Sequence, residues 1–84
     1  MMSSKTQFYD AGAVAFMIES GKPEIRESDH YKNRKDEMLD LTMSCSREEA
    51  LKWMRKWMSD GITNGDNVEF LAAYDIYREL EKQN

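Results

Sequence analysis

The chain has 84 residues, a net charge of −4 at pH 7, one cysteine and one histidine. A chain of this length folds as one small domain, and its core must use nearly every large apolar residue that it has. The negative charge argues against non-specific binding to nucleic acid or to anionic membranes, and a single cysteine excludes an intrachain disulfide framework.

The N-terminal region carries no targeting or membrane signal. Residues 1–5 are largely polar, and we expect them to be frayed. They lack the charged start and apolar run of a secretory signal. The longest apolar run, residues 11–18, is shorter than the roughly twenty residues that cross a bilayer. We therefore expect a cytoplasmic protein, in keeping with the reducing compartment that a lone cysteine favours.

The first element spans residues 6–20, where apolar side chains are distributed around the whole helical wheel. Such a helix belongs inside a bundle or at an interface. Gly12 lowers helix propensity by about 1 kcal/mol relative to alanine, so a strand over residues 13–18 is the alternative. Gly21 and Pro23 end the element in either case.

The second element follows a highly charged segment in which positive and negative side chains balance. Ser28 or Asp29 can cap a helix that runs to about Met43. The apolar stripe of this helix is thin, and a small extended piece within residues 22–35 is the alternative.

The third element contains both tryptophans and is the most completely specified. Ser46 and Glu49 form a capping box, so a helix should begin at Arg47, and Gly61 should end it near Ser59. Its apolar arc, which we expect to anchor the core, consists of Ala50, Leu51, Trp53, Met54, Trp57 and Met58. Its basic side consists of Lys52, Arg55 and Lys56.

The fourth element follows an Asn-Gly turn at residues 64–65, and Asn64 or Asp66 can cap it. A helix over residues 67–81 then carries two apolar faces. The principal stripe is Phe70, Ala73, Tyr74, Tyr77 and Leu80, and the second is Val68, Leu71, Ala72 and Ile76. We expect one face to pack in the core and the other to pack against something else.

These elements predict an all-α fold, a compact bundle of three to four short helices in a single domain over residues 1–84. The residues expected in or near the core are Phe8, Phe16, Ile18, Leu51, Met54, Trp57, Phe70, Leu71 and Tyr77.

Catalytic and metal chemistry find little support in the sequence. His30 and Cys45 are the only residues of their kinds, and they cannot supply the ligands of a closed zinc site. Asp36 and Asp40 share a helical face, but two carboxylates at this spacing are more often solvent-exposed charge than part of a catalytic or metal site. We expect a protein that is not an enzyme, with no cofactor, no metal and no small-molecule substrate.

Nucleic-acid binding is an alternative. It would use the basic side of the helix at residues 47–59, through Lys52, Arg55 and Lys56. The last helix is acidic, which opposes its use as a recognition helix in a DNA groove.

The leading hypothesis rests on surplus apolar surface, because the chain offers more apolar faces than a small bundle readily buries. Tryptophan, tyrosine and methionine are enriched at protein interfaces. We expect a small module that binds another protein and modulates or inhibits it by occlusion. The residues predicted to make this contact are Trp53, Trp57, Met58, Tyr74 and Ile76. A second alternative is a self-associating structural protein, with a homodimer as its simplest form.

Overall fold

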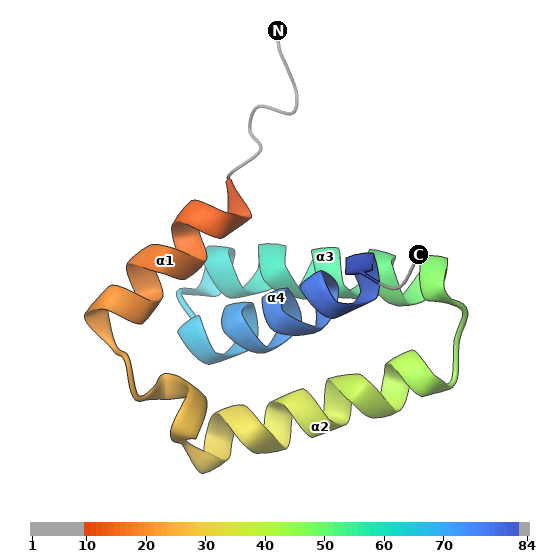
Figure 1. The fold of residues 1–84 in the computed structure, drawn as a ribbon, viewed down its shortest axis with the longest axis horizontal. Helices are drawn as coiled ribbons and strands as arrows, with labels where there is room; N and C mark the ends of the chain where they lie inside the picture. The colour runs from red at the N-terminus through yellow and green to blue at the C-terminus, as the bar shows by residue number, and fades with distance from the viewer. Residues whose placement is uncertain (1–9, 83–84) are drawn as a thin grey trace, which may run out of the picture.

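The computed structural model describes residues 10–82, which form four α-helices and one short 3₁₀ turn (Figure 1). The elements are α1 (Ala11–Gly21), η2 (Ile25–Glu27), α2 (Asp29–Met43), α3 (Arg47–Asn64) and α4 (Asn67–Lys82). The predicted all-α bundle is confirmed. The two extended alternatives are wrong, because α1 covers residues 13–18, and residues 22–35 contain η2 and the start of α2 but no strand.

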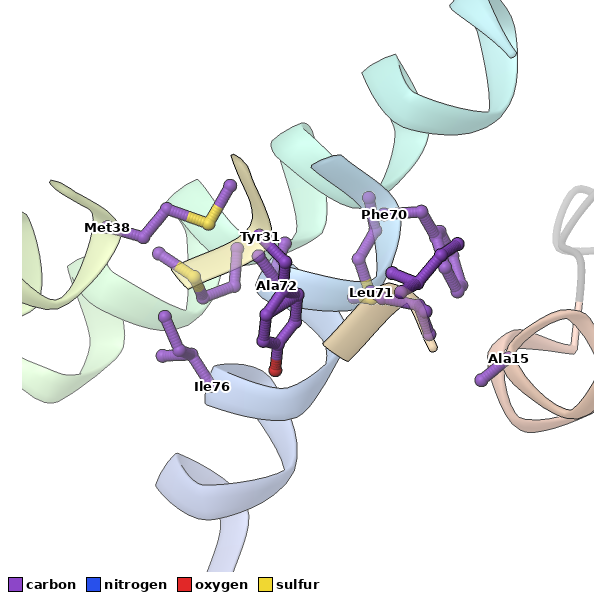
Figure 2. Close-up of a cluster of buried hydrophobic side chains, with 11 residues drawn as sticks. Ala15, Tyr31, Met38, Phe70, Leu71, Ala72 and Ile76 are labelled. Atoms are coloured by element: carbon purple, nitrogen blue, oxygen red, sulfur yellow. The ribbon is translucent and has the colours of Figure 1, made fainter. Parts of the chain in front are cut away.

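α4 is the central helix of the bundle, since it packs against α1, α2 and α3 (Figure 1). This position explains its two apolar faces, because different neighbours cover different sides of it. Figure 2 shows side chains of α4 gathered with those of the surrounding helices. The buried residues of α4 are Phe70, Leu71, Ala72, Ala73 and Ile76.

A side chain caps the start of each helix. The carboxylate of Asp10 accepts from the N–H groups of Gly12 and Ala13 at 3.0 and 3.3 Å. Ser28 and Ser46 accept at 3.2 Å from the backbone three residues on, as predicted for α2 and α3. Asp66 does the same for α4 at 3.0 Å. Each cap satisfies an N–H group that the first turn leaves without a helical partner.

The prediction that α3 ends near Ser59 is wrong. The helix continues to Asn64 and ends at Gly65, which has the left-handed φ of 68°. Gly61 lies inside the helix and is buried. A Cβ at Gly61 would lie 2.8 Å from the backbone N of Phe70 on α4. Glycine is therefore needed at position 61 for the close approach of two helices, and at position 65 for the turn.

On α3 the core is formed by methionines, whereas Trp57 was expected in the core and Trp53 at the contact with a partner. Met54 and Met58 of α3 are buried, whereas the side chain of Trp53 is 41% exposed and that of Trp57 is half-buried. Phe16 is 68% exposed, so its expected place in the core is also wrong. Phe8 lies outside the described residues.

The other core predictions hold to different degrees. Met54, Phe70 and Leu71 are buried, while Leu51 is half-buried and Ile18, Trp57 and Tyr77 pack against the core from its rim. The buried residues that the predicted core list does not contain include Ile25, Tyr31, Met38 and Ile76.

Replacing Gly61 with alanine should destabilise the bundle. The added Cβ would force α3 and α4 apart, at a cost of about 1–3 kcal/mol that outweighs the gain of about 1 kcal/mol in helix propensity. Gly21→Ala is the matched control, because a Cβ at Gly21 at the end of α1 meets nothing within 4 Å. Urea unfolding of both variants should show a loss of stability for Gly61→Ala alone. Equal stability of Gly61→Ala and the wild type would contradict this account of the crossing.

Candidate functional site

Trp53 is the centre of the candidate site. It lies on the outer side of α3, and its ring centroid is 5.4 Å from that of Trp57, with the planes tilted by 42°. The ring borders a surface depression of about 370 Å³ that is lined by Glu49, Lys52, Trp53 and Lys56. We call these four residues, together with Trp57, the Trp53 surface.

Trp57 is held from the other side by α2. The guanidinium of Arg34 lies 4.9 Å from the centroid of the Trp57 ring, which is a cation–π arrangement. The same guanidinium donates to both carboxylate oxygens of Glu69 on α4, at 2.7 and 3.1 Å, and to Glu37 at 3.0 Å. The hydrogen bonds to Glu69 raise the pKa of Arg34. Arg34 is therefore held in place by Glu69 and Glu37, and it in turn supports the ring of Trp57 beside Trp53.

The three basic residues predicted as one contact face do not lie together. Lys52 and Lys56 line the depression beside Trp53, and Lys56 also pairs with Asp60 at 3.0 Å. The guanidinium of Arg55 instead lies 5.6 Å from the ring centroid of Tyr77 on α4. The structure thus brings two of the three cations to the tryptophan.

Three of the five residues predicted to bind a partner lie elsewhere. Met58 is 3% exposed and Ile76 is 1% exposed, so neither offers a side chain to a partner, and their predicted exposure is wrong. Met58 on α3 and Ile76 on α4 both belong to the buried core cluster. Tyr74 stacks on Phe70 and accepts a hydrogen bond from Arg78 at 2.9 Å. It borders a different depression, beside α1.

A second arginine anchors η2 and α1 to the central helix. Arg26 donates to both oxygens of Asp75 at 2.7 and 2.8 Å, and it also pairs with Glu19 of α1. The hydroxyl of Tyr31 donates to the same Asp75. Hydrogen bonding to Asp75 raises the pKa of Arg26, and burial raises the pKa of Tyr31 above its ordinary value of 10.0. Planar two-point pairing of this kind fixes orientation as well as distance.

His30 and Cys45 do not form a catalytic pair. His30 lies in the first turn of α2, and Cys45 lies beyond its last residue, so about 20 Å of helix separates them. The thiol of Cys45 donates to the carbonyl of Leu41 at 3.3 Å, and His30 is exposed. Within residues 10–82 there is no group of three or more His, Cys, Asp or Glu residues that could hold a metal ion.

Sequence reasoning missed two features of the surface. One is Arg34, whose role depends on contacts across the bundle that no local pattern records. The other is the exposed apolar side of α1, which carries Phe16 and Met17 at 68% and 64% exposure. The uncharged run of α1 indicates an interface, whereas the size of Phe16 favours a place in the core, and the sequence pattern does not decide between the two.

Comparisons with known proteins identify no relative: no protein-family model, no curated protein and no solved structure matches the chain. The helices of residues 10–82 include none with the length and apolar character needed to cross a membrane.

The stabilising contribution of Tyr31 should be lost at alkaline pH. Its pKa is raised in the folded state, so the stability that its neutral hydroxyl contributes is complete below pH 10 and is lost as the pH rises above 10. Tyr31→Phe should reduce the free energy of unfolding at pH 7 by about 1–2 kcal/mol, because a hydrogen bond to a carboxylate is lost. Urea titrations between pH 8 and pH 11 should also show a shallower alkaline decline for the variant. A decline as steep as that of the wild type would contradict this role.

The two tryptophans should differ in fluorescence. Trp57→Phe leaves Trp53 as the emitter, and its exposed ring should emit at longer wavelength and be quenched more strongly by acrylamide. Trp53→Phe leaves Trp57, which is half-buried beneath Arg34 and should be better shielded. Equal quenching of the two variants would mean that Trp53 is covered in solution.

Proposed function

We propose that this chain is a non-enzymatic module that binds another protein through the Trp53 surface, and that it modulates or inhibits this partner by occlusion. The observation that carries the proposal is a tryptophan that is 41% exposed, supported by a second tryptophan and bordered by a depression. Tryptophan is one of the residue types enriched among the hot spots of protein interfaces.

Rigid support favours a binding role for Trp53. Trp57 lies beside it, Arg34 lies over Trp57, and Glu69 holds Arg34 with two hydrogen bonds. A side chain that is already ordered loses little conformational entropy when a partner covers it. The surface is therefore suited to act as an anchor without rearrangement.

The charges around Trp53 indicate the chemistry of the partner. Lys52 and Lys56 line the same depression as the indole ring. They would attract carboxylates and set the encounter rate and orientation of an acidic partner. The matching ligand is a protein segment that carries an apolar side chain flanked by aspartate or glutamate. A cytoplasmic location also remains part of the proposal, supported by the reducing compartment that a single cysteine favours.

Nucleic-acid binding is the alternative that one observation favours, since an aromatic ring between two lysines resembles a platform for a stacked base and its phosphates. Two features oppose it. Glu49 lines the same depression, and Asp60 already pairs with Lys56. The net charge of −4 adds a repulsive background.

Selection from a random peptide library displayed on phage tests the proposal. The enriched peptides should share an apolar residue next to acidic residues. Synthetic copies should bind the wild type and lose about 30-fold or more in affinity with Trp53→Ala, the loss that corresponds to a hot spot of about 2 kcal/mol. Leu39→Ala is the matched control, because Leu39 is 39% exposed on α2 and should leave the affinity unchanged.

Two results would count against protein binding at this surface. One is a selection without a consensus, or peptides that bind Trp53→Ala as tightly as the wild type. The other is binding of a labelled single-stranded oligonucleotide that weakens with salt and is lost in Lys52→Glu, which would favour the nucleic-acid alternative.

A further inference from the structure

We infer that two copies of this chain pair through the outward face of α1, with the two helices antiparallel. The proposal concerns a surface separate from the Trp53 surface and does not depend on the function proposed for it. It rests on the exposure pattern of α1, on the spacing of its residues and on the charges at its two ends.

The outward face of α1 is mostly apolar, and none of its exposed residues is charged. Its exposed residues are Gly12, Ala13, Phe16, Met17, Ser20 and Gly21. Phe16 is 68% exposed and Met17 is 64% exposed, while Ala15 is the one residue of this helix that is buried. Charged residues dominate the exposed sides of α2 and α3, whereas none of the exposed residues of α1 is charged. Glu19, whose side chain is 44% exposed, flanks this face and pairs with Arg26.

The spacing of these residues fits a helix pair. Ala13 and Ser20 are seven residues apart, and Phe16 and Met17 lie between them, which is the arrangement of a short heptad seam. In an antiparallel pair with its two-fold axis between positions 16 and 17, Phe16 of each copy faces Met17 of the other. Each Ala13 then faces a Ser20. Aromatic rings and methionine sulfur make favourable contacts, and the small residues allow the helices to approach.

The charges at the ends of α1 select a second copy in antiparallel orientation. Asp10 caps the N-terminus, and Lys22 caps the C-terminus. Antiparallel pairing places the carboxylate of one copy near the ammonium group of the other at both ends, and it also aligns the helix dipoles favourably. A parallel pair would set like charges together. Because the face between the ends lacks cations and the chain is acidic, an anionic membrane is a poor alternative occupant.

Neighbouring residues extend the contact. Met17 and Ile62 line a groove of about 390 Å³ between α1 and the corner of α3 and α4, and Ile62 is 40% exposed. One short helix covers less than the roughly 1,200 Å² of total buried surface that marks the lower end of standard interfaces. We therefore expect a weak dimer that forms with increasing protein concentration.

Sedimentation across a concentration series tests the pairing. The wild type should shift from monomer to dimer, and Met17→Glu should raise the dissociation constant at least tenfold. Met43→Glu is the matched control, because it makes the same change at an 82% exposed position on α2 and should leave dimerisation intact. Lys22→Glu should also weaken the dimer, since it sets two carboxylates against each other. Circular dichroism of each variant should match the wild type.

Disulfide trapping tests the orientation. With Cys45→Ser as background, Ala13→Cys and Ser20→Cys proteins of different mass tags are mixed and oxidised. In an antiparallel pair, Ala13→Cys of one variant should form a disulfide with Ser20→Cys of the other. In a parallel pair, each variant should instead form disulfides between two of its own copies.

Several results would overturn the proposal. They are a monomer at every concentration, a dimer that survives Met17→Glu, a dimer that is lost in Trp53→Ala instead, and trapping within each protein only. Binding of the monomer to neutral phosphatidylcholine vesicles that is lost in Met17→Glu would assign the face to lipid and would equally overturn it.

Discussion

The close crossing of α3 and α4 at Gly61 is the constraint on which the rest of the bundle depends. Because the backbone of Phe70 fills the space that a side chain at position 61 would need, the two helices meet in one register. Met54 and Met58 then face α4. Each tryptophan precedes one of these methionines by one residue and is rotated by about 100° from it. The exposure of Trp53 thus follows from register and not from polarity.

Much of the fold could be predicted because its signals are local. The caps at Ser28, Ser46 and Asp66 each accept from a backbone N–H three residues on, so sequence alone reveals them. Glycine is ambiguous, since it ends helices and also permits close packing. Gly61 and Gly65 have these two different roles, and only the position of Phe70 decides between them.

The candidate site could be predicted only in part. The apolar arc of α3 was wide enough to contain both a core face and a surface face, and residue size did not tell which was which. The face of α3 that carries Met54 and Met58 is buried against α4. Trp53 lies on the exposed side of the helix, beside Lys52 and Lys56. Arg34, which lies over Trp57, pairs with Glu69, 35 residues further along the chain. The spacing of apolar residues in the sequence does not predict a contact between positions so far apart.

The central helix follows its three partners in the chain, although it supplies much of the core (Figure 1). During synthesis, α1, α2 and α3 are therefore made before the surface that covers their apolar sides exists. α3 is next to α4 in sequence, and short loops close fastest, so these two should pair first. α2 and then α1 must return over longer stretches of chain. We therefore expect the helices to join the core in the reverse of the order in which a ribosome makes them.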